Sequence, residues 1–183
     1  QILETAAEFM QTRAFSAFSY QDIADRLGIT KAAIHSHYRT KELLGNALLE
    51  KSLEDLKEFH RKVENSSDDV WERFDAFVTA SESLVIDENK VCPVGVLQVE
   101  HNVIQESIQK AVSRFYNQNR AWIVKLLEQG REGGEMIFQG NTEDQAELVL
   151  AAIQGALMNA RAERLEILSN VAKQLKASMK SVQ

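Results

Sequence analysis

Proline and cysteine are nearly absent from this sequence of 183 residues, which contains one of each. A single thiol excludes a disulfide within the chain, and we expect the protein to work in a reducing cytoplasm. No apolar run approaches the roughly 18 residues that a membrane-spanning helix requires, so no membrane segment is predicted. Few glycines interrupt the long stretches of alanine, leucine, glutamate, glutamine and lysine, and this composition favours helix almost throughout.

The formal net charge of −6 gives no argument from the whole molecule for binding nucleic acid. Any such activity has to rest on a local surface. Signals for catalysis are also missing, because no arrangement of serine, histidine and carboxylate can be recognised. The glycine-rich segment 130–135 closes a predicted helix, whereas a nucleotide-binding loop follows a strand. We therefore predict neither an enzyme nor a cofactor.

The first fifty residues predict three short helices and the start of a long one, over 1–13, 20–27, 31–37 and from 41 onward. Ser19 followed by Asp22 is a capping pair for the second helix. Gly28 follows that helix, where a left-handed turn residue is expected. Two short helices joined by a tight turn, with a helix before and another after, form a helix-turn-helix unit.

After residue 50 the apolar pattern predicts longer helices and no strands. These helices are expected over about 42–64, 68–87, 93–101, 105–132, 143–164 and 165–181. The expected fold is therefore all-α, with about nine helices. It combines a helix-turn-helix domain over 1–46 with a larger helical bundle over 47–183, and the long helix from 41 joins the two.

The segment ITKAAIHSHYRTKELL, residues 29–44, gathers two histidines, three basic side chains and a tyrosine. His35 and His37 lie two positions apart, so a helix turns them about 200° away from each other. They cannot share a metal ion, and no metal site is predicted. Ile34 and Tyr38 lie on the side that can pack against the preceding helix. The other side is small and polar, which suits a helix that enters the major groove of DNA. A face that only contacts solvent is the alternative.

The stretches ILETAAEFMQTRAF, SYQDIADRLGITKAAIHSHY and TKELL resemble the N-terminal domain of the TetR family of transcriptional regulators. The resemblance places the base-reading face on Gln21, Lys31, Ala32, Ala33, His35, Ser36 and His37. It places phosphate contacts on Ser19, Tyr38 and Lys41.

Two residues depart from the family pattern. The family usually has an aromatic residue where His35 stands, so the contact at that position is expected to differ. It usually has glycine where Ala14 stands. Since alanine disfavours a left-handed cap, the helix over 1–13 is expected to end differently.

The resemblance also implies a homodimer built from the last two helices, 143–164 and 165–181. Small residues recur along the first of these helices at spacings that allow another helix to come close: Ala152, Gly155, Ala156, Asn159 and Ala160. They are candidates for the dimer interface, and ordinary packing within the chain is the alternative.

Regulators of this family enclose an effector between the helices that correspond to 42–132. The candidate pocket residues are Trp71, Phe74, Val78, Cys92, Leu97, His101, Phe115, Tyr116 and Trp122. Most of these side chains also suit an ordinary core. The polar groups of the pocket could come from Gln98, Glu100, His101 or Tyr116. A pocket of this kind suits a small, largely apolar effector.

Cys92 precedes Pro93, a residue that favours the first position of a helix. At such an N-cap, the helix dipole and Lys90 would lower the thiol pKa and favour the reactive thiolate. The pattern of Cys92, a small-residue stretch and Glu100 also resembles a TetR subgroup, some of whose members sense electrophiles or oxidants. A buried, unreactive thiol is the alternative.

Together these features predict a ligand-responsive transcriptional repressor that binds a palindromic DNA operator as a homodimer. A small-molecule effector would release it by shifting the helix over 42–64. DNA affinity is expected to fall steeply with salt. A thiol sensor of the same fold is one alternative, and a helical interaction protein without DNA binding is another.

Overall fold

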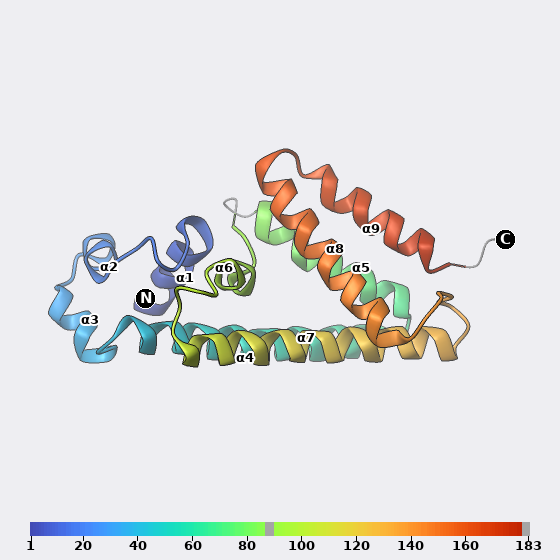
Figure 1. The fold of residues 1–183 in the computed structure, drawn as a ribbon, viewed down its shortest axis with the longest axis horizontal. Coiled ribbons are helices and arrows are strands. Elements are labelled where there is room, and N and C mark those ends of the chain that lie inside the picture. The colour runs from blue at the N-terminus through green and yellow to red at the C-terminus, as the bar shows by residue number, and fades with distance from the viewer. Residues whose placement is uncertain (87–89, 181–183) are drawn as a thin grey trace. The chain divides into compact units, whose positions relative to one another are not determined.

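The computed structural model describes residues 1–86 and 90–180. Within these ranges the chain forms nine α-helices and no strand, which confirms the predicted all-α fold (Figure 1). The helices are α1 (Ile2–Arg13), α2 (Tyr20–Leu27), α3 (Lys31–His37), α4 (Lys41–Ser66), α5 (Val70–Ile86), α6 (Pro93–Val99), α7 (Glu106–Glu132), α8 (Thr142–Ala162) and α9 (Glu166–Ser178). None of the described helices is long and apolar enough to cross a membrane. Two predicted helices end at residues 87 and 181, and these two positions lie outside the described residues.

Packing divides the chain into two compact units, and each unit combines two separate stretches. The N-terminal unit contains Gln1–Asp55 and Lys90–Tyr116, and the C-terminal unit contains Leu56–Asn89 and Asn117–Gln183. α4 and α7 each contribute to both units. The packing units therefore differ from the predicted division at residues 46 and 47, because α6 and the start of α7 pack with the helix-turn-helix segment. As a division of function, that boundary stays a prediction.

The N-terminal unit is built around one apolar core that includes Phe9, Phe15, Phe18, Ile23, Ile34, Leu44, Leu97 and Ile108. At Gly45, the backbone of α4 comes very close to other side chains of this core. A Cβ atom there would lie 2.8 Å from both the Phe15 ring and the Ile108 side chain, closer than real Cβ contacts allow. The glycine therefore lets α4 pack directly against the loop after α1 and the start of α7.

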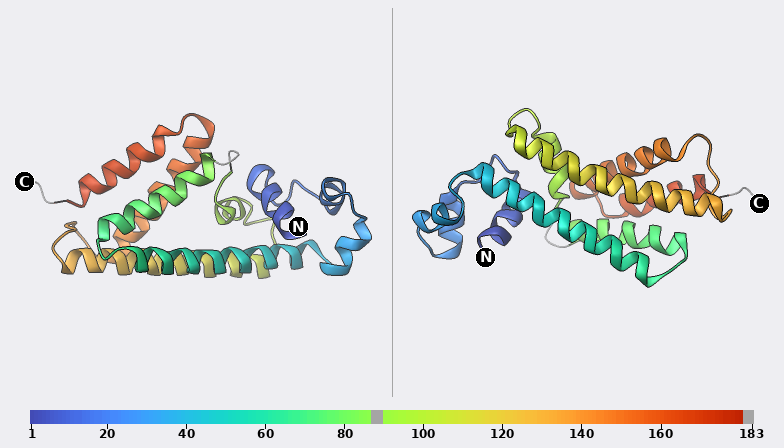
Figure 2. Two further views of the ribbon diagram at one scale, coloured as in Figure 1. Left: turned by 180° about the vertical axis from the view of Figure 1, so that it is seen from behind. Right: turned by 90° about the horizontal axis from the view of Figure 1, so that it is seen from below.

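In the C-terminal unit, α8 and α9 pack against each other and against α5. Figures 1 and 2 show α8 and α9 side by side. Apolar side chains fill the space between the helices, among them Phe74, Phe77, Val149, Ile153, Leu157 and Leu168. Burial of such side chains holds the helices together.

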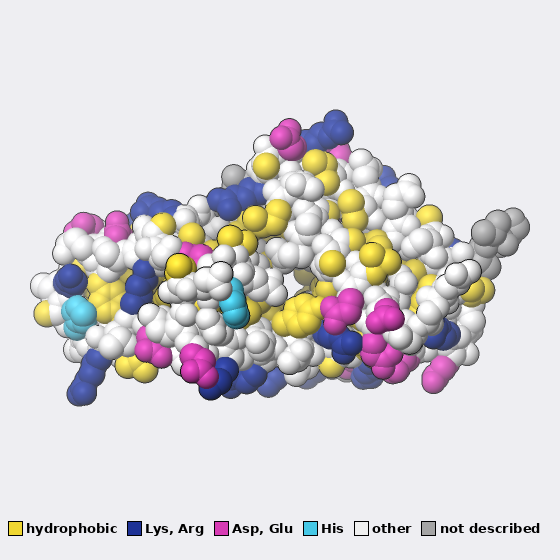
Figure 3. Space-filling model, viewed as in Figure 1, with side chains coloured by type: hydrophobic (Ala, Val, Ile, Leu, Met, Phe, Trp, Pro, Cys, Tyr) yellow, Lys and Arg dark blue, Asp and Glu magenta, His cyan; other side chains and the backbone are white. Residues whose placement is uncertain are grey.

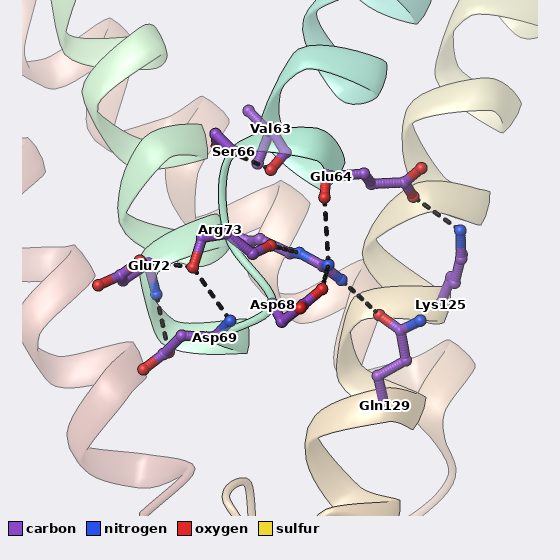
Figure 4. Close-up of polar contacts among 10 residues, drawn as sticks. Val63, Glu64, Ser66, Asp68, Asp69, Glu72, Arg73, Lys125 and Gln129 are labelled. Carbon is purple, nitrogen blue, oxygen red and sulfur yellow. Dashed lines mark hydrogen bonds and ion pairs between the residues drawn. The ribbon is translucent and has the colours of Figure 1, made fainter.

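Arg73 joins three segments of the C-terminal unit (Figure 4). Its guanidinium donates to the Ser67 carbonyl at 2.6 Å, to the Gln129 side-chain oxygen at 3.0 Å and to the Glu64 carbonyl at 3.3 Å. It also pairs with Asp68 at 3.3 Å. Because Arg73 is buried, these acceptors replace the water that its charge would lose, and they fix the turn between α4 and α5 against α7.

Candidate DNA-binding surface

The start and the end of α2 follow the predicted local signals. The main-chain N–H of Ser19 donates to the Asp22 carboxylate at 2.7 Å, and the N–H of Asp22 donates to the Ser19 hydroxyl, which completes a capping box. The hydrogen bonds from Ser19 hold the pKa of the Asp22 carboxyl below its usual range. Gly28 ends the helix in the left-handed conformation with φ of 65°. The turn that positions α3 is therefore fixed by local contacts.

One buried side chain and one tyrosine hold α3 against α2. Ile34 is fully buried. The Tyr20 hydroxyl donates to the Tyr38 carbonyl at 2.9 Å, and the His35 ring lies edge-on to Tyr20 with 4.8 Å between the ring centres. The Thr30 hydroxyl caps α3 by accepting from the Ala33 N–H at 3.1 Å. The orientation of this short helix is thus set by its contacts with α2 and by its cap.

The outer side of α3 carries most of the predicted base-reading face. Six predicted residues are exposed: Gln21, Lys31, Ala32, His35, Ser36 and His37. Ala33 and Tyr38 are half-buried, and Ser19 is exposed at the start of α2. Figure 3 shows basic and histidine side chains at the α3 end of the N-terminal unit. The alanine side chains leave room for close approach to a groove, and the neighbouring side chains offer hydrogen-bonding groups, as a helix that reads a DNA groove requires.

Lys41, for which a phosphate contact is predicted, has partners within the protein itself. Its ammonium donates to the carbonyl oxygens of Phe15 and Phe18 and lies over both of their rings. Burial lowers the pKa of this lysine. The charge is therefore directed into the loop between α1 and α2, where it holds that loop against the start of α4.

α1 ends without the left-handed cap that a glycine at position 14 would favour. α1 ends at Arg13, and Ala14 takes a φ of 99° and a ψ of 156°. Alanine thus adopts a conformation that favours glycine, and its N–H still donates to the Met10 carbonyl at 3.2 Å. The surrounding contacts impose this strained angle on the residue.

Glu100 binds the two residues that follow Ala14. Its carboxylate accepts from the main-chain N–H groups of Phe15 at 2.8 Å and Ser16 at 2.9 Å, and also from the Ser16 hydroxyl. Glu100 follows the last residue of α6, so it ties α6 to the loop of the helix-turn-helix segment. The sequence suggested Glu100 as a polar group of the pocket. Its actual partners lie 84 and 85 residues away, and no local signal indicates them.

The candidate pocket residues fall into both compact units. Trp71, Phe74, Val78 and Trp122 belong to the C-terminal unit, and Cys92, Leu97, His101, Phe115 and Tyr116 belong to the N-terminal unit. Phe74, Val78, Leu97 and Trp122 are buried, and His101 is exposed. Buried positions fit the core alternative as well as a pocket, so the pocket stays a prediction.

The predicted activation of Cys92 is wrong in direction. Cys92 does precede α6, with Pro93 as the first helical residue. Burial nevertheless raises the pKa of its thiol, and this effect outweighs the hydrogen bonds from the N–H groups of Gly95 and Val94, which lower it. A thiol in this environment is less ionised at neutral pH than a free cysteine, which disfavours the thiol-sensing alternative.

Comparisons with known proteins agree with this arrangement of helices. Residues 2–48 match the family of bacterial regulatory proteins of the tetR type, and residues 71–174 match the C-terminal domain of LmrA/YxaF-like transcriptional regulators. The chain belongs to the TetR family. Regulators of this family are DNA-binding transcription factors, not enzymes.

Individual relatives are distant in sequence and close in fold. The transcriptional repressor DhaR of Mycobacterium sp. strain GP1 is 22% identical over 89% of this chain and 82% of its own length. The repressor KstR2 of Rhodococcus jostii RHA1 is 26% identical over 73% of this chain and 65% of its own length. A TetR regulator from Agrobacterium tumefaciens, 24% identical, superposes with a TM-score of 0.94 over 98% of this chain and 96% of its own.

The five small residues of α8 that are candidates for the dimer interface of this TetR chain differ in exposure. Neither packing within the chain nor a dimer interface alone accounts for all of them. Ala156 and Ala160 are buried in the core, as ordinary packing within the chain requires. Gly155 and Asn159 are exposed, and Ala152 is half-buried. A Cβ atom at Gly155 would meet no atom within 4 Å. The described part of the chain therefore gives no packing reason for a glycine in the middle of α8, where it costs about 1 kcal/mol relative to alanine.

Proposed function

We propose that this TetR-family protein is a repressor that binds a palindromic operator as a homodimer and leaves it when a small-molecule effector binds. The single observation that carries the proposal is the exposed face of α3 on a rigidly capped helix-turn-helix. Repression is favoured because the relatives DhaR and KstR2 are named transcriptional repressors.

The proposed dimer uses the outer side of α8. Exposed apolar residues accompany Gly155 and Asn159. Leu148 is 52% exposed and Met158 is 40% exposed on α8, and Leu165, just beyond the helix, is 49% exposed. Apolar groups around small residues allow two helices to pack closely. A two-fold dimer presents two α3 helices to successive major grooves, which explains why a palindromic operator is expected.

The experiment begins by selecting DNA from a random-sequence pool with the full chain. We expect an enriched palindrome with half-sites about one helical turn apart. Fluorescence anisotropy then compares Lys31→Ala with Lys62→Ala, which removes another exposed lysine, on α4. Lys31→Ala should weaken operator binding at least about tenfold, and Lys62→Ala should leave it unchanged.

The proposal fails if no sequence is enriched. It also fails if both lysine variants bind the selected DNA as tightly as the unaltered protein, because the exposed side of α3 would then be a face that only contacts solvent.

A further inference from the structure

The ring of His35 is held in one orientation on the exposed side of α3. Its Nδ1 lies 3.3 Å from the main-chain oxygen of Arg39, and the ring lies edge-on to Tyr20 with 4.8 Å between the ring centres. Because a carbonyl oxygen can only accept a hydrogen bond, Nδ1 carries the proton. In the neutral ring the lone pair is then on Nε2, the distal nitrogen. The contact with Arg39 therefore selects one tautomer of His35.

Nε2 of His35 is available to a partner on the side of α3 that is expected to meet DNA. The side chain is exposed, and the contact of Nδ1 with Arg39 is its only hydrogen bond to the described residues. Lys31 and Ala32 lie four and three positions earlier and are also exposed. Residues at this spacing share one face of a helix. In the neutral ring, Nε2 is thus an unused acceptor on the predicted base-reading face.

The hydroxyl of Ser36, the next residue, has the same hydrogen-bonding polarity. It donates to the Ala33 carbonyl at 2.7 Å and keeps only lone pairs for a further partner. Lys31, in contrast, can only donate. In the major groove, the hydrogen-bond donors are the exocyclic amino groups of cytosine and adenine. An acceptor on this face, such as Nε2 of His35, therefore fits one of these two bases.

The groups around the His35 ring leave its charge to be set by the pH. From α2, Tyr20 faces the ring, and burial raises the pKa of its hydroxyl, which stays neutral. Lys31 and Arg39, four positions before and after His35, are both positively charged. The ammonium of Lys41, at the start of α4, is directed into the loop between α1 and α2. A histidine changes its charge between about pH 5 and 8, and the added proton turns its acceptor nitrogen into a donor.

We propose that His35 is a specificity-determining residue whose Nε2 accepts a hydrogen bond from the exocyclic amino group of a cytosine or an adenine in the operator. A proton on Nε2 removes this contact, so recognition at one position of each half-site depends on pH. The inference rests on the proposed function, because α3 has to dock in the major groove.

Base analogues in the operator selected by the full chain test the contact. Each cytosine or adenine of the half-site is replaced in turn by 2-pyrimidinone or purine, which lack only the exocyclic amino group. Fluorescence anisotropy measures the affinity at about pH 8 and at about pH 5.5. At one position, loss of the amino group should weaken binding about three- to tenfold at the higher pH, which corresponds to one hydrogen bond. At the lower pH this penalty should disappear.

Two variants assign the penalty to His35. His35→Phe keeps a ring against Tyr20 and removes both nitrogens, so it should bind the altered and unaltered duplexes equally at that position at either pH. His37→Gln removes the other exposed histidine of α3. It should keep the pH-dependent penalty, whatever its overall affinity. Contacts made by Ser36 or Lys31 should cost the same at both pH values, because neither side chain changes its charge in this range.

The proposal is overturned if no amino group has a penalty that disappears at the lower pH, or if His35→Phe retains that penalty. A contact of His35 with a phosphate would give a different result, in which His35→Phe weakens all duplexes by the same factor. If His35→Phe does not fold, the unaltered protein and His37→Gln at the two pH values still decide the outcome.

The same measurements separate this contact from the proposed function. The absence of any enriched operator would contradict the proposed function and this contact with it. An operator that is bound without a pH-dependent penalty for an amino group would contradict the His35 contact alone.

Discussion

At the scale of single residues, the decisive contacts join positions far apart in the sequence. Lys41 reaches carbonyls 23 and 26 residues away, and Glu100 reaches N–H groups 84 and 85 residues away. His60 pairs with Asn119, 59 residues along the chain. A helical pattern shows which side of a helix is apolar, but it does not show which distant group meets a charged side chain. The roles of these residues could therefore not be predicted.

Ala14 provides a stability test at this scale. It has the only positive φ among the described residues other than glycine. We expect Ala14→Gly to stabilise the protein by about 1 kcal/mol, because relief of strain exceeds the extra entropy that glycine gives the unfolded chain. Urea unfolding measures the change. The control Ala121→Gly, in the interior of α7, should destabilise by a similar amount. Equal destabilisation by both variants would contradict the strain at Ala14.

His60 gives a pH dependence whose sign follows from its lowered pKa. The folded protein takes up the proton only near pH 4, whereas an unfolded histidine does so near 6.5. Stability is therefore complete above pH 6.5 and falls as the pH drops through this window, by roughly 3 kcal/mol in total. Chemical denaturation between these pH values should show this loss in the unaltered protein and in His101→Gln, an exposed histidine. His60→Phe should lack it, and an unchanged profile there would assign the loss to other groups.

At the scale of helices and turns, the sequence predicted most of the fold because the signals are local. Ser19 with Asp22 starts α2, Gly28 ends it, and Thr30 starts α3, each within a few residues of the element it bounds. α2 and α3 accordingly have the predicted limits. α1 also ends at Arg13 as predicted, but the backbone angle of Ala14 beyond it could not be predicted from alanine's own preference.

Glu100→Gln tests the connection between α6 and the helix-turn-helix loop. The amide keeps one acceptor oxygen and loses the negative charge that three donors share, so we expect a loss of about 1–3 kcal/mol in unfolding free energy. Hydrogen exchange should increase at the N–H groups of Phe15 and Ser16. Gln98→Glu, at an exposed position of α6, serves as the control and should leave this exchange unchanged. Continued protection of both N–H groups in Glu100→Gln would show that other contacts hold the loop.

At the scale of the whole molecule, the family could be predicted from the N-terminal helices, whereas the roles of residues in the C-terminal unit could not. The residues around 29–44 resemble the TetR family closely, and their exposed face is where the pattern predicted it. The predicted pocket and the small-residue stripe combine core and surface positions, because a helical spacing of small or apolar residues does not distinguish an internal partner from an external one.

Substitutions at Gly155 distinguish packing within the chain from packing against a second subunit. Since a Cβ atom there meets nothing within 4 Å, Gly155→Ala should stabilise the chain by up to about 1 kcal/mol. Gly155→Leu should also fold, yet it should convert a homodimer into monomers, because the larger side chain would occupy the space of the partner helix. Sedimentation equilibrium at micromolar concentration measures the change. A dimer that persists in Gly155→Leu would place the interface elsewhere.

Operator binding through α3 is tested most directly by the salt dependence of DNA affinity for the selected palindrome and for a scrambled duplex. A dimer whose α3 helices dock in two major grooves, with about six to ten phosphate contacts, should lose roughly a thousandfold or more in affinity between about 50 and 200 mM salt. It should prefer the palindrome at every salt concentration. An affinity that does not change with salt, or that is equal for both duplexes, would contradict sequence-specific docking of α3 in the major groove.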